Sequence, residues 1–246
     1  MTISQRCGYL FVAALVVLAG CSSGQKKQDQ ILDELANLDK ETIFERAEQL
    51  YSEKEYQKAR DLFAFVYDSF PNDPLGHKAA LRVADTYSVK KDVTSLTEAR
   101  LRYRDFANRY PNDPDRDYAL LMVGHTYSAR KLRPDRDLSD IQQALGAYQQ
   151  LVNLYPNSRY MPEADGRMND LNELLAQHEW IVAHFYMRNK RYLGALWRLE
   201  NIRENYPNYS QIDTINEKIT EMETAIEERD ASWKKHLEEL KKESED

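Results

Sequence analysis

The chain has 246 residues, 30% of them charged, and its formal net charge at pH 7 is −7. This length allows one or two domains with a sizeable core. The acidic balance argues against nucleic acid as a partner, because nucleic-acid-binding domains usually carry a basic field. Glycine occurs only 8 times, and strong helix formers are abundant, which favours helices over sheets.

An apolar segment, GYLFVAALVVLAG, occupies residues 8–20. It is too short for a stable transmembrane anchor, and it has the features of a secretory signal peptide. Residues 18–21 read LAGC, which resembles the lipobox of bacterial lipoproteins. The resemblance implies cleavage before Cys21 and covalent N-acyl and S-diacylglycerol lipid on Cys21, with no other cofactor. Ordinary signal cleavage next to an incidental cysteine is the alternative.

The residues around Cys21 also bear on location. Stable anchoring takes about two lipid signals, so three acyl chains would hold the protein permanently at a membrane. Ser22 follows the cysteine, whereas aspartate at this position commonly marks lipoproteins that stay in the inner membrane. We therefore expect the periplasmic face of the outer membrane. Cys7 leaves with the signal, so the mature protein would have no free thiol for a disulfide, a metal site or a nucleophile.

A short proline-containing motif recurs four times, as FPNDP at 70–74, YPNDP at 110–114, YPNS at 155–158 and YPNY at 206–209. Apolar or small residues stand twelve, eight, five and one positions before each proline, and these steps of four, three and four place them on one face of a helix. Proline then ends the helix, and the polar residues after it can cap the next one. The residues at the first position are Ala59, Ala99, Ala144 and Ala195.

A second helix precedes each of these. It is marked by a tyrosine with a mostly small residue three positions earlier, where Glu48 is the exception. This pattern resembles the tetratricopeptide repeat (TPR), although the prolines are 40 to 51 residues apart and the repeat has about 34 residues. We expect an all-α, TPR-like α-solenoid of helix-turn-helix pairs with about five repeats, the last one a long capping helix. The tyrosines are Tyr51, Tyr87, Tyr127 and Tyr186.

The expected domain organisation follows from these patterns. Isoleucine and methionine recur every three or four residues after Pro207 and predict one helix from about 211 to 242. Its second half is either a solvated tail or a partner-binding helix. The parts are a signal peptide at 1–20, a lipidated N-terminus and flexible tether at 21–40, TPR-like repeats at 41–73, 74–113, 114–158 and 159–210, and a C-terminal capping helix with a charged tail at 211–246.

The sequence contains little that supports catalysis or metal binding. Neither GxGxxG nor GxxxxGK occurs. His178 and His184 are six residues apart, whereas zinc-binding histidines of one helix are about four apart. Aspartates at 113, 115 and 117 begin like a calcium loop, but Tyr118 stands where that loop requires glycine. We therefore expect no catalytic residues, no metal site and no enzyme.

Four longer segments resemble one family. They are NRYPNDPDRDYALLMVG at 108–124, PDRDLSDIQQAL at 134–145, LVNLYPNSRYMPEADGRM at 151–168 and LLAQHEWIVAHFYMRNKRYLGALWRLENIRENYPN at 174–208. Together with the lipobox they resemble the BamD family, lipoproteins of the outer-membrane β-barrel assembly machine. Phe185 replaces a tyrosine of the family pattern, and the C-terminal helix is more highly charged than that of the family.

The resemblance implies a non-enzymatic scaffold that binds the periplasmic POTRA domain of BamA and assists recognition, folding and insertion of outer-membrane proteins. Unfolded outer-membrane proteins and other Bam lipoproteins, where present, are the further partners, and the lipid anchor supplies the membrane contact. Arg198 stands where the family carries an arginine that faces BamA. We expect it to form a charge-assisted pair with an acidic POTRA residue. The alternative is a solvent-exposed arginine of little energetic weight.

The expected solenoid also offers a substrate surface. The first helix of each pair is expected to line the concave face, where an extended or helical peptide can lie. The expected groove residues are Glu45, Gln49, Arg82, Asp85 and His125. A TPR lipoprotein scaffold for peptidoglycan or cell-division proteins is the competing hypothesis, and the presence or absence of BamA after purification from native membranes distinguishes the two.

The lipobox makes a direct prediction. Cells grown with labelled fatty acid should incorporate the label into the wild-type protein and not into the Cys21→Ala variant, because the thioether forms on the Cys21 sulfur. Gel fluorography of the immunoprecipitated protein measures this. Label retained by the variant would show that the lipobox interpretation is wrong.

Overall fold

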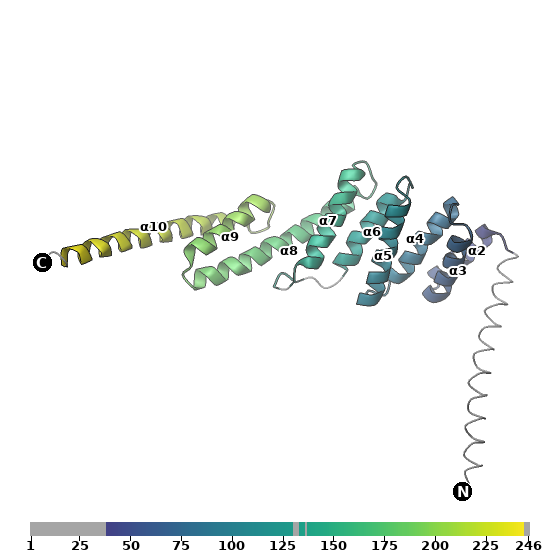
Figure 1. Cartoon of the computed structure of the whole chain (residues 1–246), viewed down its shortest axis with the longest axis horizontal. Coiled ribbons are helices and arrows are strands. Elements are labelled where there is room, and N and C mark those ends of the chain that lie inside the picture. The colour runs from purple at the N-terminus through teal and green to yellow at the C-terminus, as the bar shows by residue number, and fades with distance from the viewer. Residues whose placement is uncertain (1–37, 130–132, 136, 244–246) are drawn as a thin grey trace, which may run out of the picture. The chain divides into compact units, whose positions relative to one another are not determined.

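The computed structural model describes residues 38–129, 133–135 and 137–243. Every regular element in these ranges is a helix (Figure 1), which confirms the expected all-α, TPR-like fold. The signal peptide, Cys21 and most of the expected tether lie outside the described residues. The helices are α2 (Lys40–Ser52), α3 (Tyr56–Ser69), α4 (Pro74–Ser88), α5 (Val93–Arg109), α6 (Arg116–Ser128), α7 (Ser139–Leu154), α8 (Met161–Arg188), α9 (Tyr192–Asn205) and α10 (Ile212–Glu243).

The described residues divide into two compact units, with the boundary between Thr86 and Tyr87. In the first unit α2 packs against α3, and in the second unit each helix from α5 to α10 packs against the next one in the sequence. Such consecutive packing is the arrangement of a helical repeat protein, in which each repeat contacts only its neighbours.

The alanine column predicted from sequence forms the contact line of the helix pairs. All four alanines have no exposed surface, and the aromatic residues at the next position of the pattern, Phe63, Tyr103 and Tyr148, are equally buried. A small residue lets two helix backbones approach, and the large ring four residues later fills the space beside it. The alanines and aromatics of the repeats are therefore packing residues, as the pattern indicates.

Three of the four corners after the prolines are closed by the side chain two positions beyond the proline. The Oδ1 atom of Asp73 accepts a hydrogen bond from the Leu75 N–H at 2.9 Å, and that of Asp113 accepts one from the Asp115 N–H at 2.9 Å. In the third corner the Ser158 hydroxyl accepts from the Tyr160 N–H at 3.1 Å. These bonds satisfy amide groups that have no partner inside the following helix.

Three of the turns inside the pairs share another feature. Lys54, Lys91 and Lys190 each have a positive φ, of 66°, 53° and 54°. They follow the last turns of α2, α4 and α8, where a left-handed residue commonly ends a helix. A side chain in this conformation costs about 1–3 kcal/mol, so the packing on both sides of the turn holds the lysines there.

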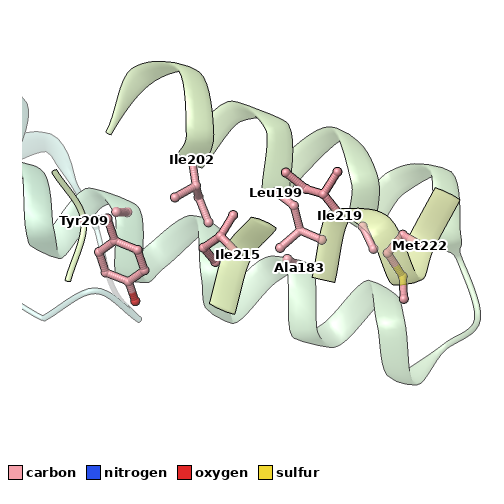
Figure 2. Packing of buried hydrophobic residues seen from close by; sticks show 9 residues of the cluster. Ala183, Leu199, Ile202, Tyr209, Ile215, Ile219 and Met222 are labelled. Carbon is pink, nitrogen blue, oxygen red and sulfur yellow. The ribbon is translucent and has the colours of Figure 1, made fainter. Parts of the chain in front are cut away.

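The last three helices share one hydrophobic cluster (Figure 2). Ala183 of α8 and Leu199 and Ile202 of α9 are fully buried in it. The expected capping helix is α10, which contributes a row of buried side chains to the same cluster, and its bounds agree closely with the predicted ones. The buried row of α10 consists of Ile215, Ile219 and Met222.

Two glycines provide a test of how tightly the second unit is packed. A Cβ atom on Gly124 of α6 would lie 2.3 Å from the Tyr148 ring of α7, whereas one on Gly146 of α7 would meet nothing within 4 Å. We expect Gly124→Ala to destabilise the protein by about 1–3 kcal/mol through overpacking. Gly146→Ala is the matched control and should stabilise it by up to about 1 kcal/mol through helix propensity. Urea denaturation followed by circular dichroism measures both, and equal midpoints would contradict the packing.

Candidate functional site

Arg198 lies on α9 and is held by a carboxylate of the preceding helix. Its Nη1 atom donates to both carboxylate oxygens of Glu179 on α8, at 2.8 and 3.2 Å. The Arg198 side chain is 29% exposed and that of Glu179 is 15% exposed. The pair fixes the direction of the guanidinium, while the Nε and Nη2 atoms make no hydrogen bond to a described residue.

Two large apolar side chains are exposed on α9, and one of them contacts this arginine. Leu193 is 62% exposed and Trp197 is 60% exposed, and they are four residues apart on one stripe of the helix. The Arg198 guanidinium carbon lies 4.7 Å from the centre of the Trp197 ring, within the range of a cation–π contact. We call Leu193, Trp197 and Arg198 the α9 surface.

The first unit contains an ion-pair network around Arg82 of α4. Its guanidinium donates to both carboxylate oxygens of Glu48 on α2, at 2.7 and 2.5 Å, and to Asp85 at 2.9 Å. It also stacks over the Tyr51 ring, with 4.0 Å between the guanidinium carbon and the ring centre. Hydrogen bonds from both carboxylates raise the pKa of Arg82, although burial acts in the opposite direction and is the largest single influence. Arg82 is therefore charged and fixed.

The other groove residues of the first unit differ in exposure. Asp85 is only 5% exposed, so it is a buried support of Arg82 and presents no groove surface of its own. Glu45 and Gln49 are exposed on α2, and the Gln49 amide donates to the Glu53 carboxylate at 2.9 Å. These four residues belong to the first unit and His125 belongs to the second.

His125 of α6 is the centre of a series of connected polar groups. One ring nitrogen, Nδ1, lies 2.8 Å from the Tyr148 hydroxyl, and the other, Nε2, lies 2.9 Å from the Glu163 carboxylate. The Ser128 hydroxyl lies 3.1 Å from the Tyr148 hydroxyl. An ionised Glu163 can only accept, so the neutral ring donates from Nε2 and accepts from tyrosine at Nδ1.

Burial lowers the pKa of His125, and Arg167 lowers it further, although Glu163 acts in the opposite direction. The ring is therefore neutral at pH 7. A histidine whose pKa is lowered by folding stabilises the folded state fully above the unfolded value of about 6.5, and this contribution is lost as the pH falls below that value.

Sequence reasoning missed the carboxylates that hold these groups. Glu48 holds Arg82, Glu179 holds Arg198 and Glu163 holds His125. For Glu48 there was a signal, because it is the one charged residue in a column that otherwise contains alanine and glycine. A charged residue in a packing column indicates a partner on the adjacent helix.

The residues that the structure describes include no group of three histidine, cysteine, aspartate or glutamate side chains placed to hold a metal ion. None of the described helices has the length and apolar character needed to cross a membrane. His178, weighed as a zinc ligand from sequence, bonds through Nδ1 to the Pro134 carbonyl oxygen at 2.5 Å. This bond holds the segment that precedes α7 against α8.

Comparisons with known proteins agree on one family. The family model described as outer membrane lipoprotein, YfiO, matches residues 36–237. Proteins named outer membrane protein assembly factor BamD are similar in sequence, and the matched part of this protein spans about a third of their length. The Xylella fastidiosa strain 9a5c protein is 33% identical over 91 residues, 35% of this sequence and 31% of its own. The Vibrio cholerae protein is 33% identical over 75 residues, 30% and 31% of the two sequences. The Neisseria meningitidis serogroup A protein is 34% identical over 79 residues, which are 32% of this sequence and 30% of its own.

The environment of His125 predicts its titration. Its ring should titrate below pH 6.5 in the folded protein and near the usual value of about 6.5 in the urea-unfolded protein. Glu163→Gln should lower the folded value further, because the carboxylate stabilises the protonated ring. NMR titration of the ring protons measures both. A folded value above the unfolded one would contradict the buried, neutral ring.

Proposed function

The chain belongs to the YfiO family of outer membrane lipoproteins, and we propose from this premise that it is a non-enzymatic scaffold of outer-membrane protein assembly. The observation that carries the proposal is the family match over residues 36–237. Relatives from three bacteria are named as assembly factors, and an assembly factor acts by binding. In this proposal Cys21 carries the lipid that holds the scaffold at the periplasmic face of the outer membrane. Other Bam lipoproteins, in cells that contain them, are further partners.

The α9 surface is the proposed contact with the POTRA domain of BamA. Tryptophan and arginine are the residues most enriched among those that dominate binding energy at protein interfaces. Arg198 is fixed by Glu179 through Nη1 alone, so its other N–H donors are directed by an existing contact and remain available. A carboxylate of the partner could accept from them, and such charge-assisted bonds are the strong ones. Leu193 and Trp197 would supply the apolar area around that pair.

Unfolded outer-membrane proteins are the proposed substrates. In the first unit Glu45 and Gln49 offer exposed polar groups on α2, and Arg82 offers a guanidinium already oriented by Glu48 and Asp85. An extended polypeptide presents unpaired amide and carbonyl groups along its length. Fixed side-chain donors and acceptors on the first helices of the pairs can satisfy those groups without reading one particular sequence. His125 is the proposed groove residue of the second unit, where it would contact the polypeptide with its ring face, because both ring nitrogens already bond to Tyr148 and Glu163.

A charge exchange tests the interface. Arg198→Glu should abolish co-purification of BamA from detergent-solubilised native membranes, because it removes the donor and places two carboxylates side by side. The double variant Arg198→Glu with Glu179→Arg restores an intramolecular pair and reverses its direction. We expect it to restore the melting temperature and to leave BamA binding at least tenfold weaker, which corresponds to about 1.4 kcal/mol.

Arg203→Glu is the matched control for this experiment. Arg203 is also on α9 and pairs only with Glu200 at 3.7 Å among the described residues, so its reversal should leave co-purification unchanged. Recovery of BamA binding by the double variant would show that Arg198 has only a structural role. The absence of BamA from the wild-type preparation would overturn the proposed function itself.

A further inference from the structure

A small cavity of about 70 Å³ lies between α8 and the corner that joins α9 to α10. Asn169, Asn172 and Glu173 of α8 line one side of it, and residues 205–209 line the other. The described residues of this lining include no lysine, arginine or histidine. Sites that enclose a whole small molecule usually have volumes of about 300–1,000 Å³, so this cavity fits one small group of a larger ligand.

The corner at this cavity is built differently from the three before it. The residue two positions after the proline is Tyr209, and the corner is held from α8 instead. The Glu173 carboxylate accepts from the Ser210 N–H at 3.1 Å and also from the Ser210 hydroxyl. Tyr209 is therefore not required to close the corner. The residues that close the other three corners are Asp73, Asp113 and Ser158.

Tyr209 presents a polar group to the cavity. The residue is only 4% exposed and lies at one end of the hydrophobic cluster of the last three helices (Figure 2). Its hydroxyl makes no hydrogen bond to a residue that the structure describes. Among the described residues no fully enclosed side-chain nitrogen or oxygen lacks a partner, so this hydroxyl opens onto the cavity that Tyr209 lines. A buried tyrosine usually has a hydrogen-bond partner, and here the partner has to come from outside.

Three asparagine side chains border the same cavity with further open groups. Asn169 and Asn172 lie one turn apart on α8, and Asn208 belongs to the corner. None of their side-chain amides bonds to another residue in the described part of the chain. Each amide offers a carbonyl acceptor and two N–H donors, whereas the Glu173 carboxylate is already engaged by Ser210. The cavity therefore suits a neutral group that both donates and accepts hydrogen bonds.

An acetamido group has these properties and is small enough for the volume. Its N–H donates and its C=O accepts, so it can pair with the Tyr209 hydroxyl and the Asn172 amide. Its methyl group can lie against the ring of Tyr206, which is half-buried at the cavity. Amino sugars carry this group on a ring whose hydroxyls can bond to the exposed Asn169 and Asn208 at the rim.

An extended peptide fits the same cavity less well. It also carries amide groups, but they follow one another at intervals of about 3.3 Å along the chain, whereas the cavity admits a single group. An N-acetylated sugar presents one amide with hydroxyls beside it. That arrangement matches a hydroxyl at the floor of the cavity and amides at its rim.

We propose that this cavity binds the N-acetyl group of an amino sugar in a glycan, with the Tyr209 hydroxyl and the Asn172 amide as its hydrogen-bond partners. Tyr206 is the apolar contact, and the sugar ring lies at the rim. The cavity shares no residue with the α9 surface, so the inference does not depend on the proposed function.

Three soluble probes test the site by titration into the full mature protein, held in micelles of a sugar-free detergent. Triacetylchitotriose carries acetamido groups, cellotriose has the same linkage with hydroxyls in their place, and N-acetylglycine methylamide carries peptide amides without a sugar. The NMR signals of the backbone amides of residues 205–210 report binding. We expect saturable shifts with triacetylchitotriose and at least tenfold weaker binding of the other two probes.

Two variants locate the site. Tyr209→Phe removes the hydroxyl and keeps the ring, so we expect about fivefold weaker binding of triacetylchitotriose, the effect of one neutral hydrogen bond. Its melting temperature should stay unchanged, because the hydroxyl bonds to no described residue. Asn172→Ala should weaken binding by a similar factor. Asn157→Ala is the matched control, because Asn157 follows the proline of the third corner and is not part of the cavity lining.

Three results would each overturn the inference. They are equal binding of triacetylchitotriose and cellotriose, tighter binding of the peptide amide, and wild-type affinity in both Tyr209→Phe and Asn172→Ala. The second result would identify the cavity as a peptide site. None of them changes the co-purification of BamA, so this site and the proposed function fail separately.

Discussion

The structure depends on how closely the two helices of each pair approach at one small residue. The alanines of the repeat column have no exposed surface, and Gly124 is the extreme case, because even a methyl group there would overlap the Tyr148 ring. The same close approach lets Tyr148 lie across α6 and reach His125 with its hydroxyl. A packing constraint thereby positions the polar groups around His125, so the core and these groups share one side chain, Tyr148.

Charge is arranged differently on the candidate surfaces. Arg82 and Arg198 are each held by a glutamate of a preceding helix, Glu48 and Glu179. Partly exposed ion pairs of this kind add little stability, typically less than about 1 kcal/mol. Their effect is orientation, since a guanidinium fixed through some of its donors presents the rest in a defined direction. His125 differs, because its neutral ring contributes no charge and is held by Tyr148 and Glu163.

Most of the fold could be predicted from sequence, and much of the site could not. Helix ends and packing columns follow from local rules, since proline stops a helix and a three-to-four step defines a face. Asp85 shows the limit, because an aspartate on a helix is normally exposed, whereas this one is buried and bonds to Arg82. The contact of His125 with Glu163 was equally inaccessible to sequence reasoning. These residues are 38 positions apart in the sequence and meet only through the packing of several helices.

An oriented guanidinium suits a folded partner. Such a partner offers carboxylates at fixed positions, so a preoriented guanidinium such as Arg198, next to the exposed Trp197 ring, favours specificity over tolerance. The orientation comes from Glu179 on the neighbouring helix, so the packing of α8 against α9 determines what the α9 surface can present to a partner.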